Sequence, residues 1–267
     1  MNVAYHANQL GIRAQMISKI GKDELGSSLM DFLSGKGIPI NLIQTDYTFP
    51  TGTVNVALDA NGSPSYEIVA PVAWDYIHAD RANKAAVSAA DAFVFGSLSS
   101  RNETSRTSLL SLIELAQLKV LDVNLRSPFF TQDLLLQLLQ LADIVKMNDE
   151  ELLIIGQWLD IDHTEAATAK KIRDHFQWQQ FIVTRGAQGA WLFNDKGMIN
   201  SDGIPIQVQD TIGSGDSFLA AFLSKFLRGE APEKCLQFAA ATGAYVATQK
   251  GGTPEFSETQ IQALLEQ

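Results

Sequence analysis

Residues 119–123, Lys-Val-Leu-Asp-Val, form a short apolar run, and residues 143–147, Asp-Ile-Val-Lys-Met, form another. A Leu-rich stretch with helical spacing lies between them, around residues 133–141. Two more apolar runs, residues 91–95 and 181–184, stand in the same alternation with helical segments. Alternation of strands and helices predicts an α/β fold in which helices cover both faces of a parallel sheet.

A different pattern precedes the alternating region. Residues 53–58 alternate between apolar and polar side chains, and an Asn-Gly pair at residues 61–62 supplies a turn. Residues 65–69 then supply the second strand, running back beside the first. This pattern predicts a β-hairpin. Spacing alone leaves two interpretations open at equal weight, an edge decoration of the sheet and a lid over a cleft. In the last third of the chain, apolar residues at helical spacing predict two helices, residues 217–227 and 232–248.

The chain begins with an apolar stripe at helical spacing, made by Val3, Ala4, Ala7 and Leu10 and ended by Gly11. No strand precedes this stripe in the sequence, although an α/β chain usually begins with one. Two hypotheses follow: the fold begins with a helix, or an N-terminal strand is missing.

The composition is that of an ordinary globular protein of 267 residues, with 46% hydrophobic residues and a formal net charge of −10. Because there is no Lys/Arg cluster, we expect no nucleic-acid partner and no binding to anionic membranes. Cys235 is the single cysteine and lies in an apolar stretch, so we expect a small buried side chain and a reducing compartment. No apolar run has the length of a membrane span and no signal peptide is visible at the first residue, which predicts a cytoplasmic protein.

Polar and glycine residues follow each predicted strand at the point where it ends. In open α/β sheets, ligands bind beyond the carboxyl ends of the strands. Each of these residues alone is also a common turn residue, but together, at four strand ends, they favour a ligand site. They are Gly96 and Ser97, then Asp122, Asn124 and Arg126, then Asn148 and Glu151, and last Thr184, Gly186 and Gly189.

The strongest local signal is the segment Asp210-Thr-Ile-Gly-Ser-Gly-Asp216, which leads directly into an apolar helix. Gly213 and Gly215 relax the backbone and Ser214 is small, so consecutive N–H groups can point at one anion at the helix N-terminus. Asp216 would then lie close to that anion. The alternative interpretation is that Asp216 is only a favourable acidic residue in the first helical turn, although such a residue needs no flanking glycines.

A carboxylate base beside an anion-binding nest suits phosphoryl transfer, which needs a positioned hydroxyl and charge neutralisation. The sequence contains no G-x-x-x-x-G-K-S/T, no G-x-G-x-x-G after a strand and no G-x-S-x-G. The four histidines lack metal-ligand spacing and are expected to be surface or core residues.

These residues resemble the ribokinase-like, or PfkB, family of carbohydrate kinases over essentially the whole chain. Residues 210–216 are similar to the family signature D-T-x-G-A/S-G-D. The resemblance implies that Asp216 is the catalytic base, that the backbone of Gly213, Ser214 and Gly215 forms an anion hole, and that ATP and Mg²⁺ are the cofactors. It also implies a three-layer sandwich around a parallel central sheet, with the hairpin as a small β lid over the sugar.

Shorter family motifs match at other positions. Asn148 and Glu151 match N-x-x-E, which the resemblance places in the outer shell of Mg²⁺, and Asp122, Asn124 and Arg126 match D-x-N-x-R. The remaining assignments are likewise what the resemblance implies. The nucleotide side comprises Thr184, Gly186 and Gly189 (T-x-G-x-x-G), Arg126, Asn148 and Gly252. The sugar side comprises Asn2, Asn124 and Asp216, and Asp210 belongs to a K⁺ site. Gly21, Asp23 and Gly26 match the family motif G-x-D-x-x-G.

Residues 50–54 (PTGTV) and 72–75 (VAWD) look most like bacterial fructokinases, although ribokinases and nucleoside kinases share the catalytic signature. We therefore expect a fructose kinase, with a kinase for another sugar or a nucleoside as the alternative. The expected division is a lid at residues 36–70 and a core made of residues 1–35 and 71–267. The expected partners are the small-molecule sugar, ATP and a second copy of the chain bound through the lid.

Members of the resembled family begin with a strand that carries a sugar-binding Asp, followed by a G-G-x-x-x-N segment. Asn2 looks like the final Asn of that segment, and the residues before it are absent from the sequence. The expectation is a genuine kinase truncated before its first strand. The alternative is a non-catalytic nucleotide-binding homologue that lacks part of its sugar site.

Overall fold

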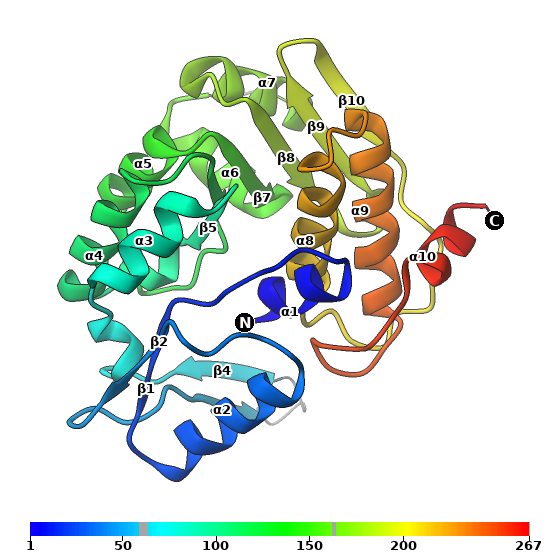
Figure 1. The fold of residues 1–267 in the computed structure, drawn as a ribbon. Coiled ribbons are helices and arrows are strands. Elements are labelled where there is room, and N and C mark those ends of the chain that lie inside the picture. The colour runs from blue at the N-terminus through cyan, green and yellow to red at the C-terminus, as the bar shows by residue number, and fades with distance from the viewer. Residues whose placement is uncertain (59–63, 162–163, 267) are drawn as a thin grey trace. The chain divides into compact units, whose positions relative to one another are not determined.

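The computed structural model describes residues 1–58, 64–161 and 164–266, and its elements are labelled in Figure 1. The chain forms two compact units. The first comprises residues 1–14, 90–98 and 116–267, and the second comprises residues 15–89 and 99–115. The predicted lid falls within the second unit, and its division from a core at residues 36 and 70 stays a prediction.

The first unit is built on a six-stranded sheet with the order β10-β9-β8-β7-β6-β5. The strands β5 to β8 run parallel, which confirms the α/β prediction made from the four apolar runs. The strands are β5 (Phe93–Gly96), β6 (Lys119–Asp122), β7 (Ile144–Asn148), β8 (Gln180–Thr184), β9 (Ala190–Asn194) and β10 (Gly197–Ser201).

The antiparallel strands β9 and β10 extend the sheet beyond β8 and were not predicted from the sequence. All five residues of β9 are buried, so its side chains show no alternation of apolar and polar residues that would reveal a strand. The side chain of Asn194 begins the turn, because its Oδ1 accepts a hydrogen bond from the Lys196 N–H at 2.9 Å. Gly197 follows with a φ of +122°.

Helices lie on both faces of this sheet, as the alternation predicts (Figure 1). On one face, α5, α6 and α7 contact strands β6 to β9. On the other face lie α8 and α9, with α1 packed on α8 and α10 packed on α9. Among the described residues, no helix is both long and apolar enough to cross a membrane. The bounds are α1 (Asn2–Gln9), α5 (Gln132–Leu141), α6 (Asp149–Trp158), α7 (Glu165–Phe176), α8 (Ser214–Phe226), α9 (Pro232–Ala247) and α10 (Glu258–Leu265).

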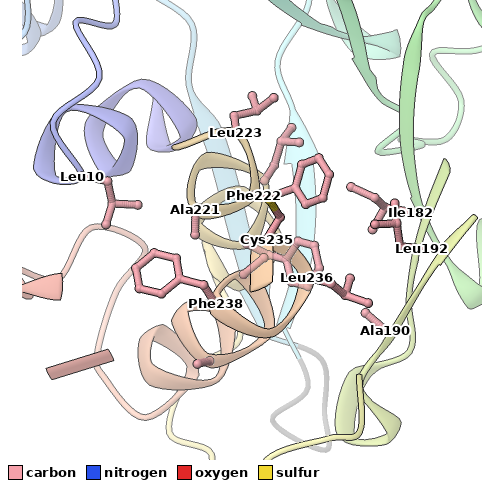
Figure 2. Packing of buried hydrophobic residues seen from close by; sticks show 14 of the residues in the cluster. Leu10, Ile182, Ala190, Leu192, Ala221, Phe222, Leu223, Cys235, Leu236 and Phe238 are labelled. Atoms are coloured by element: carbon pink, nitrogen blue, oxygen red, sulfur yellow. The ribbon is translucent and has the colours of Figure 1, made fainter. Parts of the chain in front are cut away.

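Strand alternation decides which side chains of the sheet meet α8 and α9. Ile144, Ile182 and Leu192 belong to one buried cluster with Phe222 of α8, and Figure 2 shows Ile182 and Leu192 on the side of the sheet that faces this helix. Every residue of α8 from Ser217 to Lys225 is buried. Each fully buried Phe or Leu stabilises the packing by about 1.5–3 kcal/mol, so the cluster holds α8, and therefore its first turn, in a fixed place against the strands.

Cys235 lies in the same cluster and is fully buried, as expected for the single cysteine. Burial raises the pKa of its thiol to about 11. Because the thiolate is the reactive form, Cys235 is an unreactive packing residue at neutral pH.

The second unit contains two small sheets. β1 (Ser18–Gly21) and β2 (Ile43–Asp46) pair in parallel, and β3 (Val54–Leu58) and β4 (Pro64–Ile68) form the predicted antiparallel hairpin. The predicted Asn-Gly turn at residues 61–62 lies outside the described residues. The remaining elements are α2 (Glu24–Gly35), α3 (Arg81–Ala89), α4 (Glu103–Ile113) and a short 3-10 helix (Ala73–Tyr76).

The G-x-D-x-x-G segment closes the turn from β1 into α2. Asp23 is the N-cap of α2 and accepts hydrogen bonds from the Gly26 N–H at 2.7 Å and from the Thr51 N–H at 2.8 Å and hydroxyl at 2.7 Å. A Cβ on Gly26 would lie 2.4 Å from the carbonyl oxygen of Gly21. These contacts give the motif a structural role, which is to fasten the turn to residue 51.

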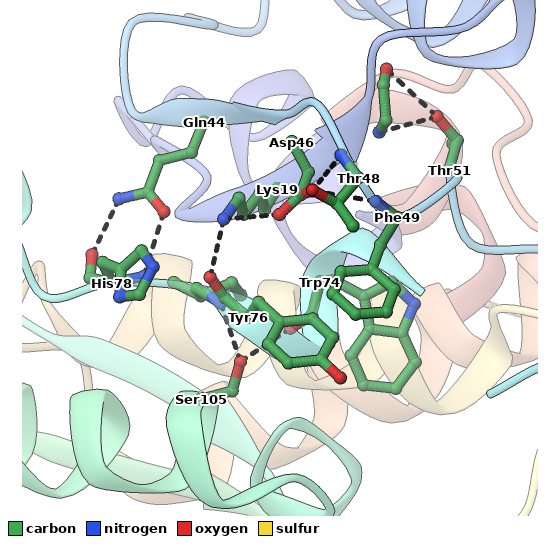
Figure 3. Close-up of polar contacts among 12 residues, drawn as sticks. Lys19, Gln44, Asp46, Thr48, Phe49, Thr51, Trp74, Tyr76, His78 and Ser105 are labelled. Carbon is green, nitrogen blue, oxygen red and sulfur yellow. Dashed lines mark hydrogen bonds and ion pairs between the residues drawn. The ribbon is translucent and has the colours of Figure 1, made fainter. Parts of the chain in front are cut away.

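A charged network holds β1, β2 and the chain after β2 together (Figure 3). Lys19 Nζ lies 2.7 Å from Asp46 Oδ2 and donates to the carbonyl oxygen of Tyr76 at 3.0 Å. Asp46 Oδ1 accepts hydrogen bonds from the backbone N–H groups of Thr48 and Phe49 at 2.8 and 2.9 Å. The hydrogen bond from Lys19, together with these backbone donors, lowers the pKa of Asp46 to about 2.

The lowered pKa of Asp46 predicts an acid-sensitive contribution to stability. A carboxyl whose pKa is depressed in the folded state stabilises the fold above its unfolded pKa, here 3.8, and the contribution disappears as the pH falls through about 2. We therefore expect Asp46→Asn to be less stable than the parent at pH 7 and equally stable near pH 2. Urea unfolding at a series of pH values measures this difference, and a difference independent of pH would contradict the assignment.

Candidate active site

The first turn of α8 presents backbone N–H groups at a helix end that has no capping side chain among the described residues. Gly213 is the N-cap with a φ of +78°, and a Cβ there would lie 2.4 Å from the carbonyl oxygen of Gly252. The N–H groups of Gly215 and Asp216 cannot have partners within the helix. The Ser214 N–H, which was predicted to join the anion hole, donates to the carbonyl oxygen of Thr211 at 3.2 Å, and its role toward an anion stays a prediction.

The side chain of Ser214 fastens this turn to α9. Its hydroxyl donates to the carbonyl oxygen of Gly243 at 3.0 Å. A Cβ on Gly243 would lie 3.2 Å from the Ser214 carbonyl oxygen, so the absence of a side chain allows this close approach. Gly243 was not among the predicted site residues, because a lone glycine within an apolar helix gives no local signal.

Asp216 is held by a residue from the other end of the chain. Its Oδ2 accepts a hydrogen bond from Asn2 Nδ2 at 2.9 Å. Asn2 is the first residue of α1, which packs on α8. The structure thus brings together two of the three predicted sugar-side residues, and Asn2 orients the carboxylate of Asp216.

The same face of α1 also holds the loop at residues 251–256. His6 Nε2 lies 2.9 Å from the carbonyl oxygen of Gly252, and because that oxygen can only accept, Nε2 carries the proton. Burial lowers the pKa of His6, which favours the neutral ring. Gln9 donates to the Pro254 carbonyl oxygen at 3.1 Å and accepts from the Phe256 N–H at 2.9 Å. The spacing of residues 2, 6 and 9, which places them on one side of a helix, is the one sequence signal for this role.

A buried ion pair lies beneath the first turn of α8. Asp122 of β6 and Lys146 of β7 stand opposite each other in the parallel register. Lys146 Nζ lies 2.9 Å from Asp122 Oδ1, and both residues are nearly inaccessible to solvent. Burial raises the pKa of Asp122, and the ammonium of Lys146 opposes that rise. Lys146 was not among the predicted site residues.

Asn148 and Glu151 form a reciprocal pair at the start of α6. Asn148 Oδ1 accepts from the Glu151 N–H at 2.7 Å, and Glu151 Oε2 accepts from the Asn148 N–H at 3.0 Å. This is a capping box, but Glu151 does more than cap. Its Oε1 accepts from the Leu125 N–H at 2.7 Å, which ties it to the loop that carries Asn124 and Arg126. Burial raises the pKa of Glu151.

The donor set around Glu151 suits a Mg²⁺ ion that keeps its water ligands. No three His, Cys, Asp or Glu side chains gather into a metal cage within the described part of the chain. Mg²⁺ commonly keeps several waters and takes one or two carboxylates together with substrate phosphates. Each Glu151 oxygen accepts one backbone N–H and retains a second lone pair. This chemistry is compatible with the predicted outer-shell role, which stays a prediction.

The predicted nucleotide-side glycines lie in the loop between β8 and β9. Thr184 donates to the Met147 carbonyl oxygen at 3.4 Å. Gly189 has a φ of +87°, and a Cβ there would lie 2.0 Å from the Ser201 carbonyl oxygen, so close packing explains this glycine. Among the described residues, no hydrogen bond or ion pair links Thr184, Gly186 or Gly189 directly to Asp216. Their role toward a nucleotide stays a prediction.

Asp210 joins the signature segment to the loop that follows α9. Its Oδ1 accepts from the Ile212 N–H at 2.9 Å and its Oδ2 from the Gly251 N–H at 3.1 Å. The adjacent Gly252 would place a Cβ 3.1 Å from Asn2 Nδ2 and 3.6 Å from the Gly213 N atom. The predicted residues Asn2, Asp210, Gly213 and Gly252 therefore lie in one continuous set of contacts.

The two segments that resemble fructokinases contact each other in the second unit. The Ala73 N–H donates to the Pro50 carbonyl oxygen at 2.8 Å, and a Cβ on Gly52 would lie 2.3 Å from Trp74 Nε1. Asp75 accepts two hydrogen bonds from Arg101, at 2.6 and 2.8 Å. The guanidinium of Arg101 also lies 3.9 Å from the centroid of the Trp74 ring. These contacts give both segments a structural role within this unit.

Comparison with known proteins decides the family. A model described as pfkB family carbohydrate kinase matches residues 1–260. The chain belongs to this family. As a pfkB carbohydrate kinase it is a phosphotransferase that acts on sugars, which confirms the resemblance drawn from residues 210–216.

Similar pfkB proteins include plant fructokinases. Probable fructokinase-4 of Arabidopsis thaliana is 29% identical over 282 residues, which cover 99% of this chain and 85% of the relative. A fructokinase of Solanum tuberosum is 28% identical over 275 residues, which cover 98% of this chain and 83% of the relative.

Solved structures confirm the ribokinase-like fold. The fructokinase of Xylella fastidiosa with bound ATP superimposes with a TM-score of 0.89 at 24% identity, covering 99% of this chain and 88% of that one. The fructokinase of Vibrio cholerae O395, in a form with bound fructose, ADP and calcium ion, superimposes with a TM-score of 0.84 at 22% identity. The match covers 99% of this chain and 89% of that one. The ribokinase of Thermotoga maritima superimposes with a TM-score of 0.82 at 19% identity, and the match covers 100% of this chain and 86% of that one.

Proposed function

We propose that this pfkB kinase transfers the γ-phosphoryl group of ATP to a hydroxyl group of fructose, with Asp216 as the base. The observation that carries the proposal is the position of this carboxylate. It lies in the first turn of α8, beside helix-end N–H groups, and Asn2 holds it at 2.9 Å. A base and an anion-binding helix end in one turn supply the two groups that phosphoryl transfer requires.

In the proposed step, the sugar hydroxyl oxygen forms a bond to the γ-phosphorus while the bond from that phosphorus to the β–γ bridging oxygen breaks. The hydroxyl proton passes to the carboxylate of Asp216, and ADP leaves with the electron pair of the broken bond. The N–H groups of Gly213 and Gly215 donate to the oxygens of the transferring group. Mg²⁺, bound through waters near Asn148 and Glu151, would neutralise phosphate charge.

Fructose is proposed as the substrate because the similar plant proteins are named fructokinases. The neighbour from Vibrio cholerae O395 was solved with fructose and ADP, and that from Xylella fastidiosa with ATP. Another sugar or a nucleoside is the competing substrate, since a ribokinase shares the fold. A K⁺ site at Asp210 and a cytoplasmic homodimer through the hairpin β3–β4 are further proposals, and sedimentation of the purified chain tests the dimer.

A substrate panel tests the function. The purified chain is incubated with MgATP and, separately, with fructose, glucose, ribose and adenosine, and ADP release is followed by a coupled assay. We expect the highest kcat/KM with fructose and no ADP release when Mg²⁺ is chelated. A preference for another acceptor would contradict fructose as the substrate but would leave the proposed kinase activity intact. ADP release independent of every acceptor would contradict the proposed transfer.

A further inference from the structure

Lys146 occupies a position in β7 that strand alternation turns toward α8. Ile144, two residues earlier, belongs to the cluster around Phe222. Successive side chains of a strand point to opposite faces, so Lys146 lies on the same face as Ile144. It stands at the carboxyl end of the strand, opposite Asp122 on β6 and Ile182 on β8. An ammonium group therefore lies where the apolar layer ends and the first turn of α8 begins.

The ammonium of Lys146 reaches the backbone of that first turn. Its Nζ lies 3.3 Å from the point that a Cβ on Gly215 would occupy. Gly215 is the second residue of α8 and precedes Asp216. A side chain at residue 215 would crowd the ammonium, so the glycine leaves the space between the lysine and the helix end open.

Lys146 has more hydrogen-bonding capacity than Asp122 uses. An ammonium carries three N–H donors, and the one hydrogen bond that Lys146 makes among the described residues goes to Asp122 Oδ1 at 2.9 Å. Only 6% of Lys146 is exposed to solvent, so water does not readily satisfy the other donors. A buried ion pair alone contributes little net stability, because desolvation offsets the attraction between the charges. A further anionic partner at the helix end would use both the remaining donors and the N–H groups there.

We propose that Lys146 is a further ligand of the transferring phosphoryl group, to which its ammonium donates from the sheet side while the N–H groups of α8 donate from the helix side. This inference rests on the proposed kinase function. Asp122 is the positioning residue that holds the ammonium against the strand. A lysine is a compact point charge that binds phosphate oxygens well, and this one is fixed before the substrate arrives.

The test compares two variants that differ only at residue 146. Asp122→Asn removes the carboxylate and keeps the ammonium, and the double variant Asp122→Asn/Lys146→Met removes both charges with little change of shape. The double variant leaves no unpaired buried charge, so it avoids the main reason for misfolding. The control is Lys225→Met/Glu258→Gln, which removes another buried lysine and one of its two carboxylate partners at the far end of α8.

The binding measurement is calorimetric titration of each protein with MgATP and MgADP. Loss of a charged hydrogen bond to the γ-phosphoryl group should weaken MgATP binding by about tenfold or more in the double variant, while MgADP affinity stays nearly unchanged. The Lys225 control should keep the parent's ratio of the two affinities. Asp122→Asn, whose amide oxygen can still accept the hydrogen bond from Lys146, should stay closer to that ratio than the double variant does. A parallel fall in both affinities, or an unchanged ratio, would show a purely structural role and overturn the proposal.

Activity adds a second readout. The double variant should lose about 100-fold in kcat with little change in the KM for the sugar, and the Lys225 control should turn over as the parent does. A parent that phosphorylates no acceptor would refute the proposed function, whereas the ratio of MgATP to MgADP affinity would still decide the role of Lys146. If the double variant does not fold, a crystal structure of the parent with MgATP decides: Lys146 Nζ beyond about 3.2 Å from every phosphate oxygen overturns the proposal.

Discussion

Replacing Asp216 by asparagine is expected to lower kcat for sugar phosphorylation by about 100- to 10,000-fold, with little change in MgADP affinity. The amide has nearly the same size as the carboxylate and can still accept the hydrogen bond from Asn2. It cannot accept the proton of the sugar hydroxyl, so the loss falls on the rate of transfer. Steady-state kinetics and calorimetric titration with MgADP measure the two quantities separately.

The matched control for this variant is Asp133→Asn. Asp133 is likewise an acidic residue in the first turn of a helix, α5, and its side chain is exposed. An aspartate that only complements the helix dipole contributes about 0.3–1 kcal/mol to stability and nothing to turnover. If Asp216→Asn behaves as Asp133→Asn does, with a small loss of stability and full activity, Asp216 is a helix-end residue and the proposed mechanism is wrong.

Gly213→Ala is expected to lower kcat by about 100- to 1,000-fold, the usual cost of losing one donor to a developing negative charge. The φ of +78° at Gly213 is unfavourable for alanine. The added Cβ would also lie 2.4 Å from the Gly252 carbonyl oxygen and 2.8 Å from its Cα, both backbone atoms that cannot swing aside. The start of α8 must therefore move, which displaces the N–H groups beside Asp216. Kinetics and thermal unfolding measure the effect.

Gly251→Ala separates backbone strain from this clash. Gly251 has a φ of +77°, almost the same as that of Gly213, but no atom lies within 4 Å of the position that its Cβ would take. Alanine there should cost only the strain of a left-handed residue, about 1–2 kcal/mol, and leave kcat close to that of the parent. Equal losses of activity in the two variants would show that strain alone is responsible and that the N–H groups of Gly213 and Gly215 need no fixed position.

The predictable part of the fold follows patterns that lie within a few residues. The runs at residues 119–123 and 143–147 are the buried strands β6 and β7, because strands covered on both faces are continuously apolar. Residues 190–194 are equally buried, but the chain returns there as an antiparallel edge pair. Since a short buried run has no period of its own, it could not be distinguished from other apolar segments.

The residues of the candidate site also fall into two groups, those that a local sequence pattern revealed and those that only the structure revealed. The turn at Gly213 and the N-x-x-E motif of Asn148 and Glu151 are local, so their spacing along the chain was enough to single these residues out, although their reciprocal hydrogen bonds came only with the structure. Lys146 looked like one polar residue in an apolar strand, and His6 like a lone histidine in an apolar helix. Each acquires a role only through a partner far along the chain: Gly252 for His6 and the first turn of α8 for Lys146.

The sequence by itself determined the family, the parallel strands and the place of Asp216, the proposed base, because each depends on short-range hydrophobic period or on a contiguous motif. Tertiary structure alone decided what surrounds that base. Asn2 reaches Asp216 across 214 positions of the chain, and Asp122 meets Lys146 because β6 and β7 pair in one particular register. Register and helix packing are set by burial of the whole apolar core, in which each residue depends on many others at once, so no local pattern of residues encodes these contacts.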